Sequence, residues 1–305
     1  MNRRRIMADD VGMRTLVGID RDRLYGAALV LLGRLGFAEN HVTLAHIGPA
    51  VGAQLSPVPL VYAYYDAGEL AAVAKRVGTD LLQEATDVAC ASGIDSVESV
   101  YEIGSSSVQL MRLADERRVD LVAIGSGQHG AVESFFLGSV GRALAIGAHQ
   151  SFLISRREGN STGPLKAVFA TDHSEYANRC FSRLIDMNPE GLKHVTIVTA
   201  TESNLLATDD HPELSLTEVE ETMTLHGEEM VERLQATGRT AEFRLIEGFP
   251  AEAIAKAMTD TDADLLILGA RGHGLIERVF IGSLALHAVV AEPYSVLVIR
   301  IPEVA

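Results

Sequence analysis

The sequence predicts an α/β protein made of two tandem, doubly wound domains, each with a five-stranded parallel sheet. Short runs of Val, Ile and Leu alternate with helical patterns, the whole series occurs twice, and a polar stretch separates the two copies. Apolar runs bounded by helices are typical of parallel strands that are covered on both faces. In such sheets, ligands bind beyond the carboxyl ends of the strands.

Matching segments relate the two copies. Residues 41–46 resemble residues 194–199, and residues 119–125 resemble residues 263–269. The stretch 158–164 between the copies is rich in Gly, Asn, Ser and Pro, the composition of a linker. A repeat of roughly 150 residues is a duplicated domain and not a solenoid unit. We therefore predict domains at residues 11–158 and 163–303.

The elements of each copy follow from apolar runs and helix signals. Strands are expected near residues 14–19, 41–47, 97–103, 119–124 and 151–155, and near 165–171, 194–200, 241–246, 264–268 and 295–300. Ser174 occupies an N-cap position, and Pro250 opens a helix where proline is tolerated. We expect the copies to pack as an intramolecular pseudo-dimer through their final strands, because an exposed edge strand must be covered.

Composition restricts the classes of partner. The 305 residues include 26 basic and 41 acidic side chains, a net charge of −15, which disfavours nucleic-acid binding. Residues 202–232 hold ten acidic residues and no Lys or Arg, typical of a solvated helix face or, alternatively, of a docking surface for a basic partner. No apolar run approaches the roughly 20 residues of a membrane span.

The cysteines and the first residues indicate the compartment. Cys90 and Cys180 are the two cysteines, which excludes a disulfide scaffold and a four-cysteine zinc site. Both fall in predicted helices, which favours buried packing. Arg3, Arg4 and Arg5 are not followed by the apolar region of a secretory signal. We expect a cytoplasmic protein with neither a nucleic-acid nor a membrane partner.

Two glycine clusters in the second copy carry the functional signal. Gly269, Gly272 and Gly274 follow the fourth strand, and Gly282-Ser283 starts a helix. Glycine lets the backbone approach an anion closely, and successive N–H groups form an anion-binding nest. A helix N-terminus also favours negative charge. Together the clusters predict a polyphosphate site at one edge of the sheet.

The spacing Gly-x2-Gly-x9-Gly-Ser, with Asp172 at the end of the first strand and a proline-then-strand ending at 292–300, resembles the ATP-binding pattern of the universal stress protein family. The resemblance covers nearly the whole chain, as two tandem copies. It implies a Rossmann-like fold of the adenine nucleotide alpha hydrolase type and ATP as the ligand. Mg²⁺ could then bridge phosphate oxygens, since it prefers phosphates plus one or two carboxylates.

The resemblance also implies roles for residues of the second copy. Asp172 would hydrogen-bond the ribose or adenine side of the nucleotide, and the backbone of Val198 would flank the adenine. Residues at strand ends would hold the nucleoside: Ala170, Asp172, Val198 and Gly269. Residues of the glycine loop and the following helix start would hold the phosphates: Arg271, Gly272, His273, Gly274, Gly282, Ser283 and Leu284.

The first copy departs from the family pattern. Gln128 stands where the second copy has Gly272, and it costs roughly 1 kcal/mol or more if that position needs a positive φ. The candidate nucleotide residues of this copy are Asp20, Gly125, Gly127, Gly130, Gly138 and Ser139. We expect this site to be empty or weaker. Its loop also spells the dinucleotide fingerprint Gly-x-Gly-x-x-Gly, but it follows the fourth strand and not the first, which disfavours an NAD site.

Three functions remain open from the sequence. The first is an ATP-binding stress-response or regulatory protein, with ATP held mainly by the second copy. The second is a slow ATPase. Phosphoryl transfer needs a positioned water and added positive charge, and the loop offers little beyond Arg271 and Arg278, so we expect slow or no turnover and predict no catalytic or metal-ligating residue. The third is a nucleotide-free dimerisation or interaction module. Whether the tandem chain forms a homodimer is also open.

Overall fold

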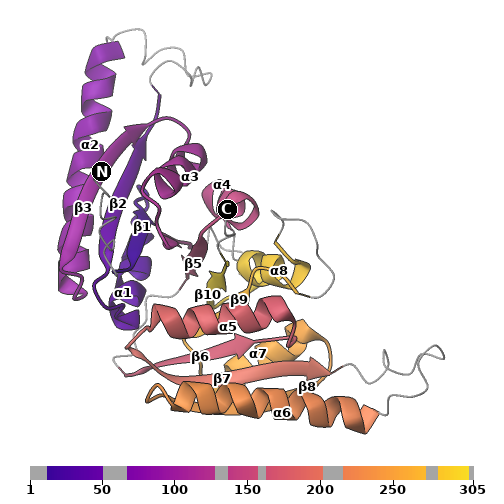
Figure 1. Ribbon diagram of the computed structural model, residues 1–305. Helices are drawn as coiled ribbons and strands as arrows, with labels where there is room; N and C mark the ends of the chain where they lie inside the picture. The colour runs from indigo at the N-terminus through magenta and orange to yellow at the C-terminus, as the bar shows by residue number, and fades with distance from the viewer. Residues whose placement is uncertain are drawn as a thin grey trace, which may run out of the picture.

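The described strands form one continuous sheet in the order β3-β2-β1-β4-β5-β10-β9-β6-β7-β8. The computed structural model describes residues 12–50, 67–127, 137–156, 163–201, 216–272 and 281–301. Figure 1 shows two lobes that meet where β5 lies beside β10. Each lobe has the same strand order, so the second half repeats the first.

The first half alternates strands and helices in parallel crossovers. Every strand pair within it is parallel. Its elements are β1 (Arg14–Gly18), α1 (Tyr25–Leu35), β2 (His41–Gly48), α2 (Ala67–Ala91), β3 (Ser96–Ile103), α3 (Ser106–Glu116), β4 (Leu121–Gly125), α4 (Ser139–Gly147) and β5 (Ser151–Ser155).

The second half follows the same plan, again with parallel pairs only. Its elements are β6 (Leu165–Ala170), α5 (Glu175–Met187), β7 (Leu192–Thr201), α6 (Leu216–Gln235), β8 (Thr240–Glu247), α7 (Pro250–Thr261), β9 (Leu265–Gly269), α8 (Ser283–Ala291) and β10 (Ser295–Ile299). The predicted fold class is confirmed. The predicted domain limits at residues 11, 158 and 303 lie outside the described residues, so the domain bounds stay a prediction.

The core lies on both faces of the sheet. One apolar cluster joins the sheet to α1, α2, α5 and α6, and the other joins it to α3, α4, α7 and α8. All five residues of β5 and of β10 are buried, because these strands occupy the middle of the continuous sheet. This two-sided burial explains why the central strands read as unbroken apolar runs.

The two halves join through an antiparallel pairing of β5 with β10, in which Leu297 lies opposite Leu153. The contact repeats itself about a pseudo-twofold axis. Ser151 Oγ accepts the backbone N–H of Arg300 at 3.1 Å, and Ser295 Oγ accepts that of Arg156 at 3.1 Å. The prediction that the final strands are the meeting edges is confirmed.

Two buried arginines tie each half to the last helix of the other. The guanidinium of Arg300 donates to the Ala145 carbonyl of α4 at 2.6 Å, and that of Arg156 donates to the Val289 carbonyl of α8. Both side chains lie near helix C-terminal ends, where the helix dipole favours a cation. The two arginines therefore strengthen the junction on the face of the sheet that α4 and α8 cover.

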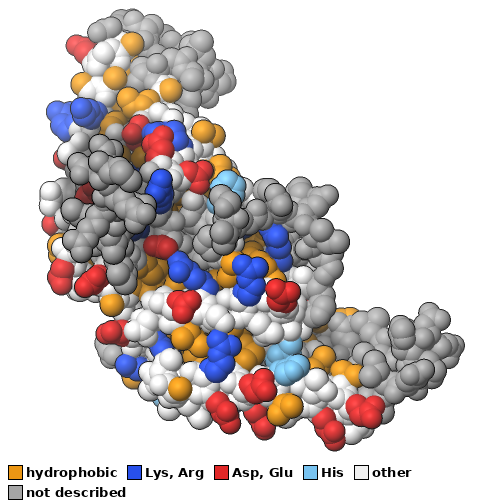
Figure 2. Space-filling model, viewed as in Figure 1, with side chains coloured by type: hydrophobic (Ala, Val, Ile, Leu, Met, Phe, Trp, Pro, Cys, Tyr) orange, Lys and Arg blue, Asp and Glu red, His pale blue; other side chains and the backbone are white. Residues whose placement is uncertain are grey.

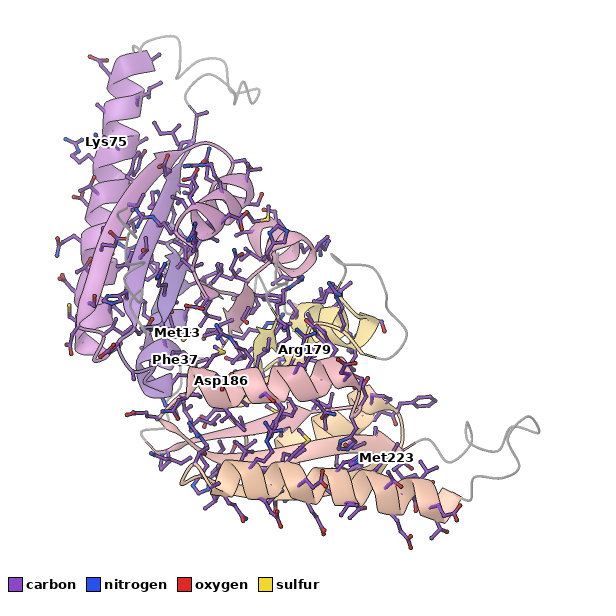
Figure 3. All side chains as sticks on the ribbon, viewed as in Figure 1. Met13, Phe37, Lys75, Arg179, Asp186 and Met223 are labelled. Atoms are coloured by element: carbon purple, nitrogen blue, oxygen red, sulfur yellow. The ribbon has the colours of Figure 1, made fainter. Side chains whose placement is uncertain are left out.

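A second contact forms where α1 ends. Gly36 caps α1 in the left-handed conformation, and the Gly191 N–H donates to the Leu35 carbonyl at 2.9 Å. Phe37 and Pro189 form an isolated bridge here, and Figure 3 labels Phe37 near the end of α5 that carries Asp186. The halves are thus joined at two separate places.

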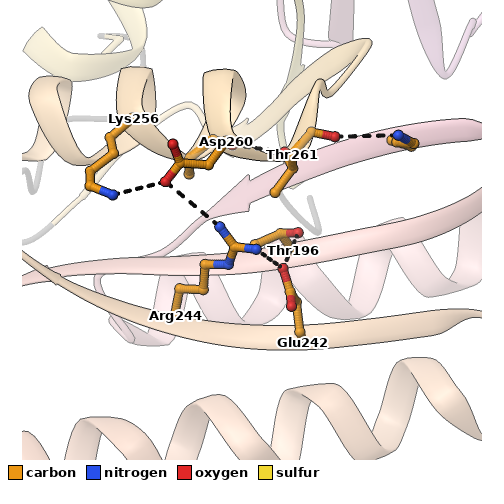
Figure 4. Close-up of polar contacts among 8 residues, drawn as sticks. Thr196, Glu242, Arg244, Lys256, Asp260 and Thr261 are labelled. Carbon is orange, nitrogen blue, oxygen red and sulfur yellow. Dashed lines mark hydrogen bonds and ion pairs between the residues drawn. The ribbon is translucent and has the colours of Figure 1, made fainter.

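Ion pairs tie the edge strand β8 to α7 in the second half. Arg244 lies 2.6 Å from Glu242 and 4.0 Å from Asp260, which also accepts from Lys256 at 2.8 Å (Figure 4). Exposed pairs of this kind are worth about 0–1 kcal/mol each. They contribute less to the fold than the buried junction does.

Buried packing was expected for both cysteines, and the structure agrees for only one of them. Cys180 is buried on α5, as expected, but Cys90 is exposed near the end of α2. Helical periodicity alone did not distinguish the covered face of this long helix from its solvent face. The prediction of buried packing for Cys90 is therefore wrong.

Replacing Ser151 with alanine removes the acceptor of a buried backbone N–H, and we expect a loss of about 1–3 kcal/mol in the free energy of unfolding. Ser295→Ala should cost a similar amount because of the pseudo-symmetry. Urea denaturation measures both. Ser99→Ala, at an exposed position of the edge strand β3, is the matched control. A Ser151→Ala protein as stable as this control would contradict the role given to Ser151 in the pairing of β5 with β10.

Candidate functional site

A cavity of about 540 Å³ opens at the carboxyl ends of β6, β7 and β9. The chain crosses from β6 to β7 on one side and from the neighbouring β9 to β10 on the other, so the connections diverge and leave room for a ligand. Its volume is in the range of small-molecule sites, about 300–1,000 Å³. It is lined by Ala170, Thr171, Asp172, Ala177, Val198, Ala200, Pro250, Ile254, Leu268, Gly269, Ala270, Arg271, Gly272, Ile281, Gly282, Ser283, Leu284 and Ala285.

One end of the cavity is apolar. Val198 comes from β7 and Leu268 from β9, and both are almost fully buried. Pro250 and Ile254 of α7 close the same end. This wall suits a flat, weakly polar group, whose burial removes apolar surface from water. Sequence reasoning found Val198 but missed the α7 residues, since only the packing of α7 on the sheet brings them there.

Asp172 is fixed at the start of α5. Its Oδ1 accepts the Ser174 N–H at 3.0 Å, and Ser174 Oγ accepts the Ala177 N–H at 3.2 Å. The predicted N-cap at Ser174 is thereby confirmed. Because the Ser174 hydroxyl caps the helix, the carboxylate of Asp172 also lines the cavity. A carboxylate here can accept hydrogen bonds from hydroxyl or amino groups of a ligand.

Gly272 lies directly against Asp172. A Cβ added at residue 272 would stand 2.8 Å from Asp172 Oδ2, closer than a real Cβ approaches such an atom. Gly272 has no φ in the left-handed region, so the condition under which a residue such as Gln128 would be strained at this position is not met in the second half. Glycine lets the loop approach the strand-end carboxylate closely, and a larger residue here would have to shift the Asp172 side chain.

The start of α8 forms the polar end of the cavity. Gly282 is the N-cap residue, its N–H donates to the Ala270 carbonyl at 2.7 Å, and it offers no side chain to cap the helix. Ser283, the first helical residue, is exposed toward solvent. The N–H groups of the first helical turn and the hydroxyl of Ser283 are suited to holding an anion.

Arg271 adds positive charge between the two ends. Its guanidinium lies 5.6 Å from the centre of the Tyr176 ring, within cation–π range. Burial raises the pKa of Tyr176 to about 12, so the phenol stays neutral beside the cation. The stacking holds Arg271 near the glycine loop, where it can face an anionic ligand.

His173 is a neighbour of the cavity that sequence reasoning did not single out. It adopts a φ of 56°, and its Nε2 lies 2.9 Å from Thr199 Oγ1. Burial and the nearby His226 lower the pKa of His173, while Asp172 acts in the opposite direction. The ring is therefore neutral near pH 7, which fits a buried Nδ1 that has no hydrogen-bond partner among the described residues.

The first half has a smaller cavity, of about 370 Å³, at its own strand ends. Asp20 and Gly125 line it, whereas Gly127, Gly138 and Ser139 do not. Gly130 lies outside the described residues, as do His273 and Gly274 of the second half. The structure thus brings two of the first-copy candidates together and separates three of them from the cavity.

Packing at the start of α1 explains the difference between the halves. The N-cap of α1 is Leu24, which has no capping side chain, and Asp20 accepts the N–H groups of Leu24 at 3.1 Å and Tyr25 at 3.0 Å. A Cβ at Gly125 would overlap the Leu24 backbone, and one at Gly127 would lie 2.7 Å from Leu24 Cδ2. In this half Asp20 accepts backbone N–H groups at the start of α1, and the loop with Gly125 and Gly127 packs against Leu24.

A model of the universal stress protein family matches residues 13–156 and again residues 165–300. The chain belongs to this family. The predicted family resemblance in two tandem copies is confirmed by the two matches, which together span most of the sequence.

Individual relatives of this universal stress protein match parts of the chain. A Staphylococcus saprophyticus universal stress protein is 29% identical over 140 residues, 45% of this chain and 83% of the relative. A Thermus aquaticus universal stress protein is 41% identical over 56 residues, 18% of this chain and 41% of the relative.

Two solved structures match the full length. One is a universal stress protein from Archaeoglobus fulgidus, with a TM-score of 0.64 and 18% identity, covering 94% of this chain and 98% of that chain. The other is a universal stress protein from Pseudomonas aeruginosa, with a TM-score of 0.59 and 17% identity, covering 95% and 93%. At this identity they show the fold alone.

Among the residues that the structure describes, no helix is long and apolar enough to cross a membrane. In the same part of the chain, His, Cys, Asp and Glu side chains do not gather in threes as metal ligands.

The neutral state of His173 predicts a pH dependence of stability. Its folded pKa lies below the usual value of 6.5, so the unfolded chain takes up the proton first as the pH falls. The stability contribution is complete above about pH 6.5 and is lost as the pH falls through the folded pKa. We expect His173→Gln to weaken the decline in unfolding free energy between about pH 7 and pH 5, measured by urea denaturation.

The exposed His149→Gln protein is the matched control for this measurement. It should keep the wild-type pH dependence. Equal pH profiles for wild type and His173→Gln would contradict the assignment of a buried, neutral imidazole at residue 173.

Proposed function

We propose that the second half of this universal stress protein binds ATP and that the protein acts as a nucleotide-dependent regulatory protein. One observation carries the proposal: a single cavity is lined by every candidate of this half that the structure describes. These residues are Ala170, Asp172, Val198, Gly269, Arg271, Gly272, Gly282, Ser283 and Leu284.

The apolar end fits the adenine. Val198, Leu268 and Ile254 offer an apolar surface against which a purine can lie. Asp172, beside this wall, can accept hydrogen bonds from the ribose hydroxyls. The close contact of Gly272 with Asp172 supports the same arrangement, since a side chain at 272 would push this carboxylate out of place.

The polar end fits the phosphates. The first turn of α8 and the Ser283 hydroxyl offer donors to an anion, and Arg271 adds a positive charge. Mg²⁺ bound with the nucleotide would neutralise phosphate charge. Asp172 is the one carboxylate among the described residues that line the cavity. Because it lies at the nucleoside end, we assign no protein ligand to such an ion.

The described lining is poor in groups that promote hydrolysis. Rapid phosphoryl transfer needs a residue that positions the attacking water and a cation that stabilises the transferred group. Within the described lining, Arg271 is the basic side chain, and Asp172 lies at the nucleoside end. We propose that ATP is a retained ligand and that any hydrolysis is slow.

The first half, in this proposal, binds nucleotide weakly or not at all. Both carboxylate oxygens of Asp20 already accept backbone N–H groups at the start of α1. The first-half cavity is also smaller than that of the second half. We therefore propose one ATP per chain. A cytoplasmic location stays a prediction.

Gly272→Glu tests the site directly. The added side chain must displace Asp172 and places a negative charge beside the phosphates, so we expect ATP affinity to fall at least about tenfold, or about 1.4 kcal/mol. Isothermal titration calorimetry measures this. Gly163→Glu, an exposed position with open space around its Cβ, adds the same charge outside the cavity and should bind like wild type. Unchanged ATP affinity in Gly272→Glu would refute the site.

A further inference from the structure

A second kind of cavity lies at the other end of the first-half strands. It has a volume of about 450 Å³ and sits where α1 ends and where β2 and β3 begin. The nucleotide-type cavity of this half lies at the carboxyl ends of the same strands. The two cavities are therefore separate, and the one at the strand starts has no part in the function proposed above.

The corresponding place in the second half is filled by an arginine side chain. Arg239 is only 7% exposed. Its guanidinium donates to Asn188 Oδ1 at 2.8 Å, to the Pro189 carbonyl at 3.0 Å and to the Leu192 carbonyl at 3.1 Å. It also donates to Thr237 Oγ1 at 2.6 Å, so the guanidinium binds four oxygens near the C-terminal end of α5.

Three features show that the two places correspond. Gly36 and Asn188 are the left-handed C-caps of α1 and α5. The residues that follow them, Phe37 and Pro189, face each other across the junction. The strands that begin next, β3 and β8, each follow a glycine with nearly the same positive φ, 82° at Gly93 and 83° at Gly238.

The first half lacks the guanidinium. Between the positive-φ glycine and the strand it has Ile94 and Asp95, where the second half has only Arg239. Ile94 is buried in the core and Asp95 is exposed. Gly36 replaces Asn188, so the oxygen of an amide side chain is absent as well. The exchanged residues Gly36, Ile94 and Asp95 all line the first-half cavity.

The charged side chains at this place also differ in sign: the second half has the positive Arg239, and the first half has the negative Asp95 and Glu39. Asp95 and Glu39 both line the cavity, and the C-terminal end of α1, with its partly negative carbonyls, faces it. A planar guanidinium matches a carboxylate with two parallel hydrogen bonds and is weakly hydrated, which favours transfer into such a place. The second half shows that this part of the fold accommodates a guanidinium.

We propose that this cavity binds a guanidinium group supplied from outside the fold, either a small guanidinium compound or an arginine side chain of a polypeptide. The bound group would take the place that Arg239 fills in the second half, with Asp95 and Glu39 as its counter-charges. Gly36 also holds the junction, since its carbonyl accepts the Glu190 N–H at 3.2 Å. Ligand binding would therefore stabilise the contact between the halves.

Titration of the full chain followed by amide NMR tests the proposal. The probes are ethylguanidinium, an acetyl-Gly-Arg-Gly-amide peptide and, as a control for charge alone, ethylammonium. We expect saturable shifts at Gly36, Asn40 and Asp95 with ethylguanidinium or with the peptide. Tighter binding of the peptide would identify a polypeptide source, and equal affinity would identify a small compound. No saturable shift with either, or equal binding of ethylammonium, would overturn the proposal.

Variants of Asp95 test the site without disturbing the fold, because this side chain is exposed. Asp95→Asn removes one counter-charge, and Asp95→Arg supplies a guanidinium of its own. We expect each to weaken ethylguanidinium binding at least about tenfold. Asp80→Asn, exposed on α2 outside the cavity, removes the same charge and should leave binding unchanged. Wild-type affinity in Asp95→Asn would contradict the site.

Discussion

The antiparallel pairing of β5 with β10 is the interaction on which the rest of the molecule depends. Each of these strands would be the exposed edge of a five-stranded sheet if the halves were apart, and such an edge must be covered. Pairing buries all five residues of both strands, and Ser151 and Ser295 satisfy the two backbone N–H groups just beyond it. Because the pairing is antiparallel, the carboxyl ends of the two halves point to opposite edges of the sheet. The two strand-end cavities are thus separate sites.

Small differences at equivalent positions give the two halves different chemistry. In the second half the Ser174 hydroxyl caps α5, so Asp172 can lie against the glycine loop and line the cavity. In the first half Leu24 offers no cap, and Asp20 takes over that role with both carboxylate oxygens. Both acids line a cavity, but Asp20 accepts two backbone N–H groups at the start of α1, whereas the N–H of Ser174 is bound by one oxygen of Asp172. A duplicated fold can in this way keep its architecture while one site diverges.

The placement of charged side chains is a further difference between the two halves. Figure 2 shows acidic side chains along α6, and exposed Glu218, Glu228 and Glu229 belong to this helix. They face solvent and are spread along the helix, as expected for a solvated face that keeps the protein from self-association. At the start of β3, by contrast, Asp95 lines a cavity whose counterpart in the second half holds Arg239.

Much of the fold could be predicted because local signals agree with tertiary structure. The apolar runs of β4, β5, β9 and β10, the cap at Ser174 and the proline that opens α7 all lie where the sequence placed them, within one or two residues. The described candidate residues of the second half also line one cavity, because glycine spacing and strand ends are properties of the chain.

What could not be predicted depends on contacts between distant segments. The reason for glycine at 272 is the nearby Asp172 carboxylate and not a backbone angle. The exposure of Cys90 depends on which face of α2 the sheet covers. The lining residues of α7 and the buried His173 follow from how helices pack on the sheet, which periodicity does not reveal. The Arg239 contacts likewise appear only when the C-terminal end of α5 is in place.

The most direct test is to denature the purified protein, never treated with nucleotide, and to identify what it releases by chromatography with mass detection. The account predicts about one adenine nucleotide per chain from wild type and little from Gly272→Glu, because it assigns ATP to the second-half cavity alone. Two nucleotides per chain would contradict the proposal that the first half binds nucleotide weakly or not at all. No nucleotide, followed by no ATP binding in titration, would contradict the central claim.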